Sequence, residues 1–120
     1  MIKLISLLAR VSDLSHEQFV QRWADGAPAS IAKSGLCRRY VQYRLHPDRA
    51  WPPGTPQIDL KLDGIEEIWL EGQEGQAAEV LARVTTAAYL ADLLSRVGAM
   101  ATYVFDEERI DQCTARRRDR

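Results

Sequence analysis

The sequence has almost no excess charge of either sign: 16 Lys and Arg residues against 17 Asp and Glu residues give a formal net charge of -1. Such a chain is not expected to attract nucleic acid or an anionic membrane surface by its overall charge. No apolar run approaches the ~20 residues of a membrane-spanning helix, and the opening MIKLISLLAR has neither a basic leader nor a small-residue cleavage site. We therefore expect a cytoplasmic protein without membrane or nucleic-acid partners.

Cysteine and histidine are also scarce, with two residues of each. Cys37 and Cys113 lie far apart and match no metal-binding spacing, which favours two reduced thiols over a disulfide. The sequence has no Gly-rich phosphate loop and no cluster of His and carboxylate residues. It therefore predicts no metal site.

What is present suffices for one folded domain: 120 residues, of which 46% are hydrophobic. Residues 2–8 are rich in Ile and Leu, which predicts a buried strand. Ser15 and Gln18 have the spacing of a capping box, so we expect a helix to begin near His16.

This helix is expected to end or kink near Asp25. Pro28 has no N–H to donate to the carbonyl of Ala24, and it disfavours helical geometry at Ala27. Proline suits the first position of a helical turn, so we expect a short new turn from Pro28 that stops at Gly35.

Residues 36–46, LCRRYVQYRLH, alternate in a way that predicts a strand with two unlike faces. The more apolar face is expected to lie against helices, and the more polar face to point away from them. The expected helix-facing residues are Cys37, Arg39, Val41, Tyr43 and Leu45; those expected on the opposite face are Arg38, Tyr40, Gln42, Arg44 and His46.

Residues 47–62 hold four of the five prolines and predict a long connection that is either functional or mobile. Residues 64–71 predict another strand, which places Ile65, Glu67 and Trp69 on one face.

Residues 73–97 have a helical pattern of apolar residues. The β-branched run at 84–86 predicts a break in this helix, with Thr86 as a cap for the second part. Gly98 is expected to end the helix, and residues 99–105 to form the last strand.

The expected order β-α-β-β-α-β predicts an α+β, ferredoxin-like sheet with both helices on one face. The bare face requires a cover, and a homodimer supplies one economically, burying Tyr40, Trp69 and Tyr103 around a polar cavity between the two sheets. The domain is expected to span residues 1–111, and the charged residues 112–120 to form a disordered tail.

Five segments together resemble the EthD family of the dimeric α/β-barrel superfamily: MIKLISLL, LSHEQFVQRW, GLCRRYVQ, LDGIEEIWL and TYVFDEERI. The resemblance covers most of residues 1–111. It implies a two-subunit barrel in which each subunit contributes one four-stranded sheet, with a small pocket between sheet and helices. It also implies chemistry without a metal or an organic cofactor.

By this resemblance, Tyr40 corresponds to the Tyr of the family's RYV strand. The chain differs from many members at Gly26-Ala27-Pro28, where they carry His-Ala-Pro. We expect Tyr40 to be a proton or hydrogen-bond donor and His46 or Glu67 to be the base. Packing for Tyr40, exposure for His46 and an ion pair for Glu67 are the structural alternatives. The expected substrate-binding residues are Asp63, Trp69, Arg44, Tyr103 and Trp51, the last as a lid or a loop anchor.

These expectations describe a small cofactor-independent enzyme that isomerises, dehydrates or cyclises a cyclic or aromatic metabolite, such as a polyketide or a lactone. A non-catalytic ligand-binding or accessory barrel is one alternative. A cofactor-free or haem-linked monooxygenase is another, since the same superfamily includes both.

Overall fold

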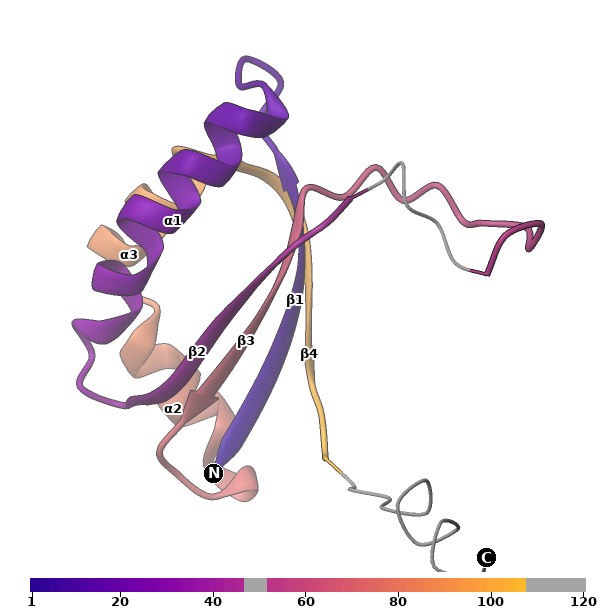
Figure 1. Cartoon of the computed structure of the whole chain (residues 1–120). Coiled ribbons are helices and arrows are strands. Elements are labelled where there is room, and N and C mark those ends of the chain that lie inside the picture. Colours follow the sequence, from indigo (N-terminus) through magenta and orange to yellow (C-terminus); the bar gives the residue numbers. More distant parts are fainter. Residues whose placement is uncertain (47–51, 108–120) are drawn as a thin grey trace, which may run out of the picture.

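The computed structural model describes residues 1–46 and 52–107. The elements are β1 (Ile2–Arg10), α1 (His16–Ala32), β2 (Cys37–Arg44), β3 (Gly64–Leu70), the 3-10 turn η1 (Glu74–Gln76), α2 (Ala77–Val84), α3 (Ala87–Leu94) and β4 (Val97–Val104). The strands form one antiparallel sheet in the order β2-β3-β1-β4, and the helices cover one of its faces (Figure 1). The predicted α+β, ferredoxin-like fold is confirmed.

Helix α1 begins as predicted. The Ser15 Oγ accepts a hydrogen bond from the Gln18 N–H at 3.1 Å, and the Gln18 Oε1 accepts one from the Ser15 N–H at 2.9 Å. These two bonds satisfy N–H groups that a helix start leaves without partners.

The predicted end of the helix near Asp25 is wrong, because α1 runs through Pro28 to Ala32. A proline inside a helix costs roughly 3 kcal/mol. Burial outweighs that cost here, since one continuous stripe of buried side chains passes the proline without interruption. The stripe consists of Phe19, Trp23, Ala27 and Ile31.

The predicted break in the second helical region is confirmed, and Thr86 caps α3 by accepting a hydrogen bond from the Tyr89 N–H at 3.2 Å. The expected helix end at Gly98 is wrong, because α3 ends at Leu94 and β4 already begins at Val97. A Cβ on Gly98 would lie 2.8 Å from the backbone oxygen of Arg10, where the β1–β4 register shifts. Gly98 therefore permits a close approach of two strands.

The core fills the space between the sheet and the helices. Its largest fully buried side chain is Trp23 of α1, which packs in one cluster with Phe19 and Leu8. A Cβ on Gly64 would lie 2.6 Å from two carbons of the Trp23 ring. Gly64 therefore leaves the room that the indole occupies against the sheet.

The predicted faces of β2 are reversed for Tyr40 and Gln42, which point toward the helices. Tyr40 packs against both core clusters, and the Gln42 Nε2 donates to the Trp23 carbonyl at 2.8 Å. The cause is a register shift between Cys37 and Arg39. Cys37 packs against the core as expected, but one extra residue turns every following side chain to the opposite side.

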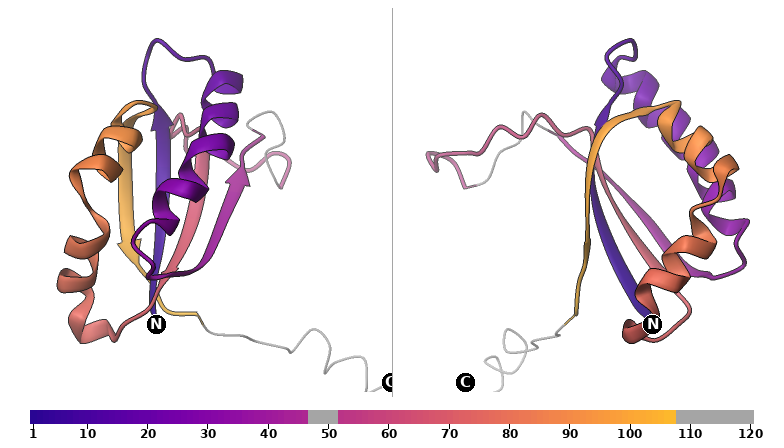
Figure 2. Two further views of the ribbon diagram at one scale, coloured as in Figure 1. Left: turned by 90° about the vertical axis from the view of Figure 1, so that its left-hand side faces the viewer. Right: turned by 180° about the vertical axis from the view of Figure 1, so that it is seen from behind.

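The other sheet face carries no helix of the described chain (Figure 2). On it the Trp69 ring lies below the Lys3 Nζ at 4.6 Å and the Arg39 guanidinium at 5.0 Å. The Tyr43 hydroxyl donates to Glu67. We call this surface, contributed by alternate residues of all four strands, the open face.

Residues 52–62, between β2 and β3, project away from the body on the side opposite the helices (Figures 1 and 2). Two of their large apolar side chains are exposed, with 83% of Ile58 and 57% of Leu60 accessible. Within residues 1–46 and 52–107, no helix is long and apolar enough to span a membrane.

Candidate functional site

A row of polar side chains crosses the sheet on its helix-facing side. Gln42 of β2, Glu66 of β3, Ser6 of β1 and Thr102 of β4 are direct partners across neighbouring strands. The Ser6 and Thr102 hydroxyl oxygens are 2.8 Å apart, and only 4% of Glu66 and 2% of Ser6 are exposed. The neighbouring row, Tyr40, Ile68, Leu4 and Val104, is mainly apolar. We call the first set the polar row.

Burial raises the pKa of the Glu66 carboxyl above its usual range. The hydroxyl of Tyr40, the positive charge of Arg96 and the indole N–H of Trp23 partly oppose this shift, since each favours the ionised form. The Gln42 Nε2 holds Tyr40 in place by donating to its hydroxyl at 3.0 Å. Glu66 is therefore a buried carboxyl beside groups that favour its ionised form.

Two tyrosines accompany this carboxyl. Burial, reinforced by the negative charge of Glu66, raises the pKa of Tyr40 far above its usual value. Burial and the same carboxylate raise the pKa of Tyr89 on α3 to about 12. Both phenols therefore keep their protons at neutral pH and can act as hydrogen-bond donors.

Arg96 enters the site from the turn between α3 and β4, with only 4% of its surface exposed. Its Nη1 donates to the Asp92 Oδ2 at 2.9 Å. A Cβ on Gly26 would lie 3.5 Å from this Nη1 and 3.5 Å from the Asp92 Oδ1. The ion pair between Asp92 and Arg96 therefore lies directly beside Gly26, and a Cβ at this position would be in van der Waals contact with it.

Two hollows flank the polar row. A cavity of about 200 Å³ lies between the sheet and the helices, and a groove of about 450 Å³ lies between α1 and β2. Ile31 lines both. The cavity is bounded by Leu4, Ser6, Ile31, Ile68, Leu70, Leu81, Val84, Thr85, Tyr89, Leu90, Leu93, Met100 and Thr102.

Tyr40 and Gln42 line the groove, whereas Ser6 and Thr102 line the cavity. Glu66 lies between the two hollows, because its cross-strand neighbours are Gln42 on one side and Ser6 on the other. Glu66 itself lines neither hollow, and its two neighbours Gln42 and Ser6 separate it from them.

The structure does not gather the predicted site residues in one place. Glu67 and Trp69 lie on the open face, on the side of the sheet away from Tyr40. His46 lines a hollow with residues 57–62 of the projecting segment. The other predicted binding residues are also dispersed: Tyr103 is exposed beside Ile5, Arg44 is exposed at the end of β2, and Trp51 lies outside the described residues.

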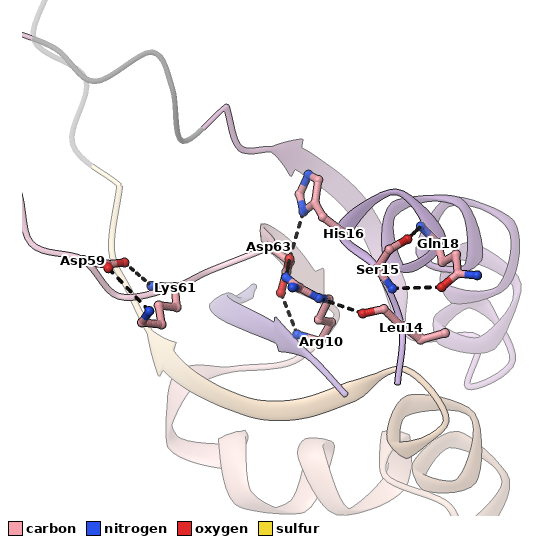
Figure 3. A network of polar contacts seen from close by, with 8 residues as sticks. All are labelled: Arg10, Leu14, Ser15, His16, Gln18, Asp59, Lys61 and Asp63. Carbon is pink, nitrogen blue, oxygen red and sulfur yellow. Dashed lines mark hydrogen bonds and ion pairs between the residues drawn. The ribbon is translucent and has the colours of Figure 1, made fainter. Parts of the chain in front are cut away.

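Asp63 belongs to a separate polar network (Figure 3). Its carboxylate accepts hydrogen bonds from the Arg10 backbone N–H and Nη1, each at 2.7 Å, and lies 2.8 Å from the His16 Nδ1. Burial alone would raise the pKa of Asp63, but these bonds together lower it below its usual value. The network joins the end of β1, the start of α1 and the approach to β3.

The sequence interpretation missed Glu66, Arg96 and Ser6. A signal for Glu66 was present, because Gly64, Glu66, Ile68 and Leu70 form the alternate face of β3, on which one carboxyl stands in an otherwise nonpolar set. Arg96 gave no comparable signal, since its burial depends on the tertiary approach of α3 to Gly26. Within the described ranges, no group of three or more His, Cys, Asp and Glu residues is arranged to hold a metal ion.

No protein-family model matches the sequence, and no curated protein sequence is significantly similar to it. Solved structures do resemble it. An ethyl tert-butyl ether D (EthD) family protein from Bacillus halodurans is 18% identical, with a TM-score of 0.60 over 90% of this chain and 99% of that one.

A Dabb family protein with a ferredoxin-like fold from Mesorhizobium loti is 13% identical, with a TM-score of 0.58 over 90% of this chain and 97% of that one. A dimeric ferredoxin-like protein of unknown function from Thermobifida fusca is 15% identical, with a TM-score of 0.52 over 88% and 90% of the two chains. At these identities the likeness establishes the fold alone: this chain is a ferredoxin-like α+β protein of the kind found in Dabb and EthD proteins.

Proposed function

We propose that this chain is an EthD-like, cofactor-independent enzyme that uses acid/base chemistry to isomerise, dehydrate or cyclise a small cyclic metabolite. The observation that carries the proposal is Glu66: a carboxyl that is 4% exposed, has a raised pKa and lies between a groove and a cavity. Perturbed carboxyls at such positions are typical of general bases and acids.

In this proposal Glu66 replaces Glu67 and His46 as the base, while Tyr40 keeps the expected role of donor. Glu66 removes a proton from the substrate, and the Tyr40 hydroxyl donates a hydrogen bond to the oxygen on which charge develops. Proton transfer by a placed side chain accelerates a reaction by about 10²–10⁴-fold. This scheme requires no catalytic side chain at position 26, where many EthD family members carry a His.

The substrate of this proposal is a single small ring. The cavity of about 200 Å³ has room for about seven groups of water size, at the ~30 Å³ that a water occupies in the liquid. Its walls are apolar except for Tyr89 and the hydroxyls of Ser6, Thr85 and Thr102, and such walls suit a ring with few polar atoms.

A homodimer formed through the open face is part of the proposal. Two features of the open face support its choice as the dimer interface. No helix of the described chain covers it, and it carries cationic, anionic and aromatic side chains that can pair with those of a second copy. The dimeric state of the similar Thermobifida fusca protein also supports it.

A non-catalytic binding protein is the second candidate. The apolar cavity favours it, because apolar walls bind a hydrophobic ligand without any chemical step. A measurement of substrate turnover distinguishes this binding protein from the proposed enzyme.

The test uses α-angelica lactone in D2O, followed by proton NMR. A base removes a proton from the carbon beside the carbonyl, the double bond shifts into conjugation, and a proton or deuteron is added at the distal ring carbon. We expect the wild-type protein to accelerate this isomerisation, and Glu66→Gln to slow it by at least about a hundredfold. Tyr40→Phe should slow it by a smaller factor.

Glu79→Gln, on the exposed surface of α2, is the matched control and should retain the wild-type rate. A large loss in Glu67→Gln with none in Glu66→Gln would return the base to the open face and reject our assignment. A wild-type protein that binds the lactone but leaves its protons in place would favour the binding protein.

A further inference from the structure

Residues 52–62, which we call the arm, leave the body of the molecule on the side of the open face (Figures 1 and 2). Within the described residues, each hydrogen bond of the arm joins two of its own residues, such as the Lys61 N–H and the Asp59 Oδ1 at 3.1 Å. The first bond to the sheet follows the arm, where the Asp63 N–H donates to the Leu8 carbonyl at 2.8 Å. No hydrogen bond of the described chain therefore fixes the arm against the sheet or the helices.

The arm nevertheless carries large apolar side chains. Ile58 and Leu60 are 83% and 57% exposed, and polar residues flank each of them in the run QIDLK, residues 57–61. Such alternation is typical of a segment that packs one side against a surface. A hollow of about 530 Å³ lies between residues 57–62 and the residues that follow β2, Leu45 and His46. Their own subunit therefore leaves both apolar side chains uncovered.

The direction and the length of the arm fit a partner on the open face. The arm and the open face lie on the same side of the sheet, and the helices lie on the other (Figure 2). Two sheets that stack face to face are ~10 Å apart. Leu60 and Ile58 precede Asp63, where the arm meets the sheet, by three and five residues. At ~3.3–3.6 Å per residue they can lie up to about 10 Å and about 17 Å from it, which is sufficient to contact a second sheet.

A second copy of this chain fits the arm better than a membrane does. The charged residues beside the apolar ones are one anion and one cation, Asp59 and Lys61, whereas an anionic membrane attracts a basic cluster. The open face likewise has charges of both signs, on Lys3, Arg39 and Glu67, with which the arm of a second copy can pair. The similar Thermobifida fusca protein is dimeric.

We propose that the arm of each subunit binds the partner subunit at the rim of its open face and buries Ile58 and Leu60 there. The inference rests on the homodimer of the proposed function and names the segment that holds it together. Lys61 has a left-handed backbone, with φ 51°, and its N–H bond to Asp59 stabilises this turn. The arm is therefore already bent before it meets a partner, which lowers the entropy lost on association.

The test compares the dimerisation of arm variants by sedimentation velocity over a range of protein concentrations. We expect Ile58→Ser and Leu60→Ser each to weaken the homodimer by at least about tenfold, because each removes buried apolar area and the two-fold symmetry removes it twice. Both variants should keep the far-ultraviolet circular dichroism of wild type, since neither side chain belongs to the core.

Leu94→Ser is the matched control. Leu94 is 64% exposed, close to the 57% of Leu60, but it lies on α3 in the helix layer. The control loses the same side chain from a surface that the proposal leaves uncovered, so it should dimerise like wild type.

Proteolysis by an enzyme that cleaves after lysine gives a second, direct measurement. The chain has three lysines, of which Lys61 lies in the arm and Lys33 is exposed at the end of α1. Cleavage after Lys61 should slow as the protein concentration rises and the dimer forms. Cleavage after Lys33 should not depend on concentration.

The arm contact is rejected if Ile58→Ser and Leu60→Ser dimerise like wild type, whereas Leu7→Glu, on the open face, dissociates the dimer. That result would keep the homodimer without the arm. A wild-type protein that stays monomeric would reject both. The catalysis is tested separately, because Ile58→Ser should isomerise the lactone at the wild-type rate. A dimer that depends on the arm but does not turn over the lactone would reject the catalysis and retain the arm contact.

Discussion

At the scale of single residues, the surroundings of Glu66 shift the pKa of its carboxyl in opposite directions. Burial favours the neutral carboxyl, whereas the Tyr40 hydroxyl, the Arg96 charge and the Trp23 indole favour the carboxylate. Burial is the larger effect, so the pKa of Glu66 is raised. A general base that must first lose its proton and then regain it works best when neither form is strongly preferred.

This balance predicts how stability depends on pH. The pKa of Glu66 is higher in the folded chain than in the unfolded chain, where it is about 4.3. Its contribution to the free energy of unfolding is therefore fully present below that pH and is lost as the pH rises through the folded pKa. Each unit of the pKa difference corresponds to about 1.4 kcal/mol.

Urea unfolding at pH 4.5 and at pH 7.5 measures this change. Between the two pH values, wild type should lose stability relative to Glu66→Gln, which has no carboxyl to ionise. Glu79→Gln should follow wild type at both pH values, because Glu79 lies on the exposed surface of α2. A Glu66→Gln protein with the wild-type dependence on pH would mean that the pKa of Glu66 is not raised.

At the scale of the elements, the packing of α1 on β3 positions the site. Trp23 lies over Gly64, and the same turn of α1 brings Gly26 against Arg96. The register of β3 then places Glu66 between Gln42 and Ser6. The position of α1 relative to the Glu66 carboxyl therefore depends on the contact between the Trp23 indole and Gly64.

Substitution of Gly64 tests this dependence. A Cβ there would lie 2.6 Å from two ring carbons of Trp23, so the ring or the strand must move. We expect Gly64→Ala to lower the free energy of unfolding by about 1–3 kcal/mol, the usual cost of an added group in a packed core. Urea denaturation, followed by far-ultraviolet circular dichroism, measures the effect.

Gly75→Ala is the matched control, because no atom lies within 4 Å of the Cβ that it adds. It should change stability by less than about 0.5 kcal/mol, as surface substitutions do. Equal effects of the two alanines would show that the indole tolerates the added methyl group and that α1 is not seated as tightly as the structure implies.

The sequence was sufficient for the order of the elements, the capping box at Ser15 and the break before Thr86, since each depends on nearby residues. The faces of β2 were predicted wrongly, because one extra residue between Cys37 and Arg39 reverses the alternation, and the partner strand determines where a bulge lies. The path of α1 through Pro28 depends on burial of Ile31, which is likewise tertiary.

At the scale of the whole molecule, the two faces of the sheet have different roles. The helix-facing side is closed and contains the polar row, the cavity and the tyrosines. The open face has Trp69 between two cations and Tyr43 bonded to Glu67, and residues 52–62 project on the same side (Figure 2). The proposed site therefore does not require the open face for its chemistry, and a partner there affects stability first.

Association through the open face is tested by placing a charge at its centre. Leu7 lies on this face between Ile65 of β3 and Ala101 of β4. Leu7→Glu should weaken the homodimer by at least about tenfold, since an unpaired carboxylate would be buried between two sheets. Sedimentation velocity over a range of protein concentrations measures the monomer–dimer equilibrium. Leu94→Glu is the control: Leu94 is 64% exposed on α3, in the helix layer, and its substitution should leave the dimer unchanged. A wild-type protein that remains monomeric, or a dimer disrupted by Leu94→Glu and not by Leu7→Glu, would contradict pairing through the open face.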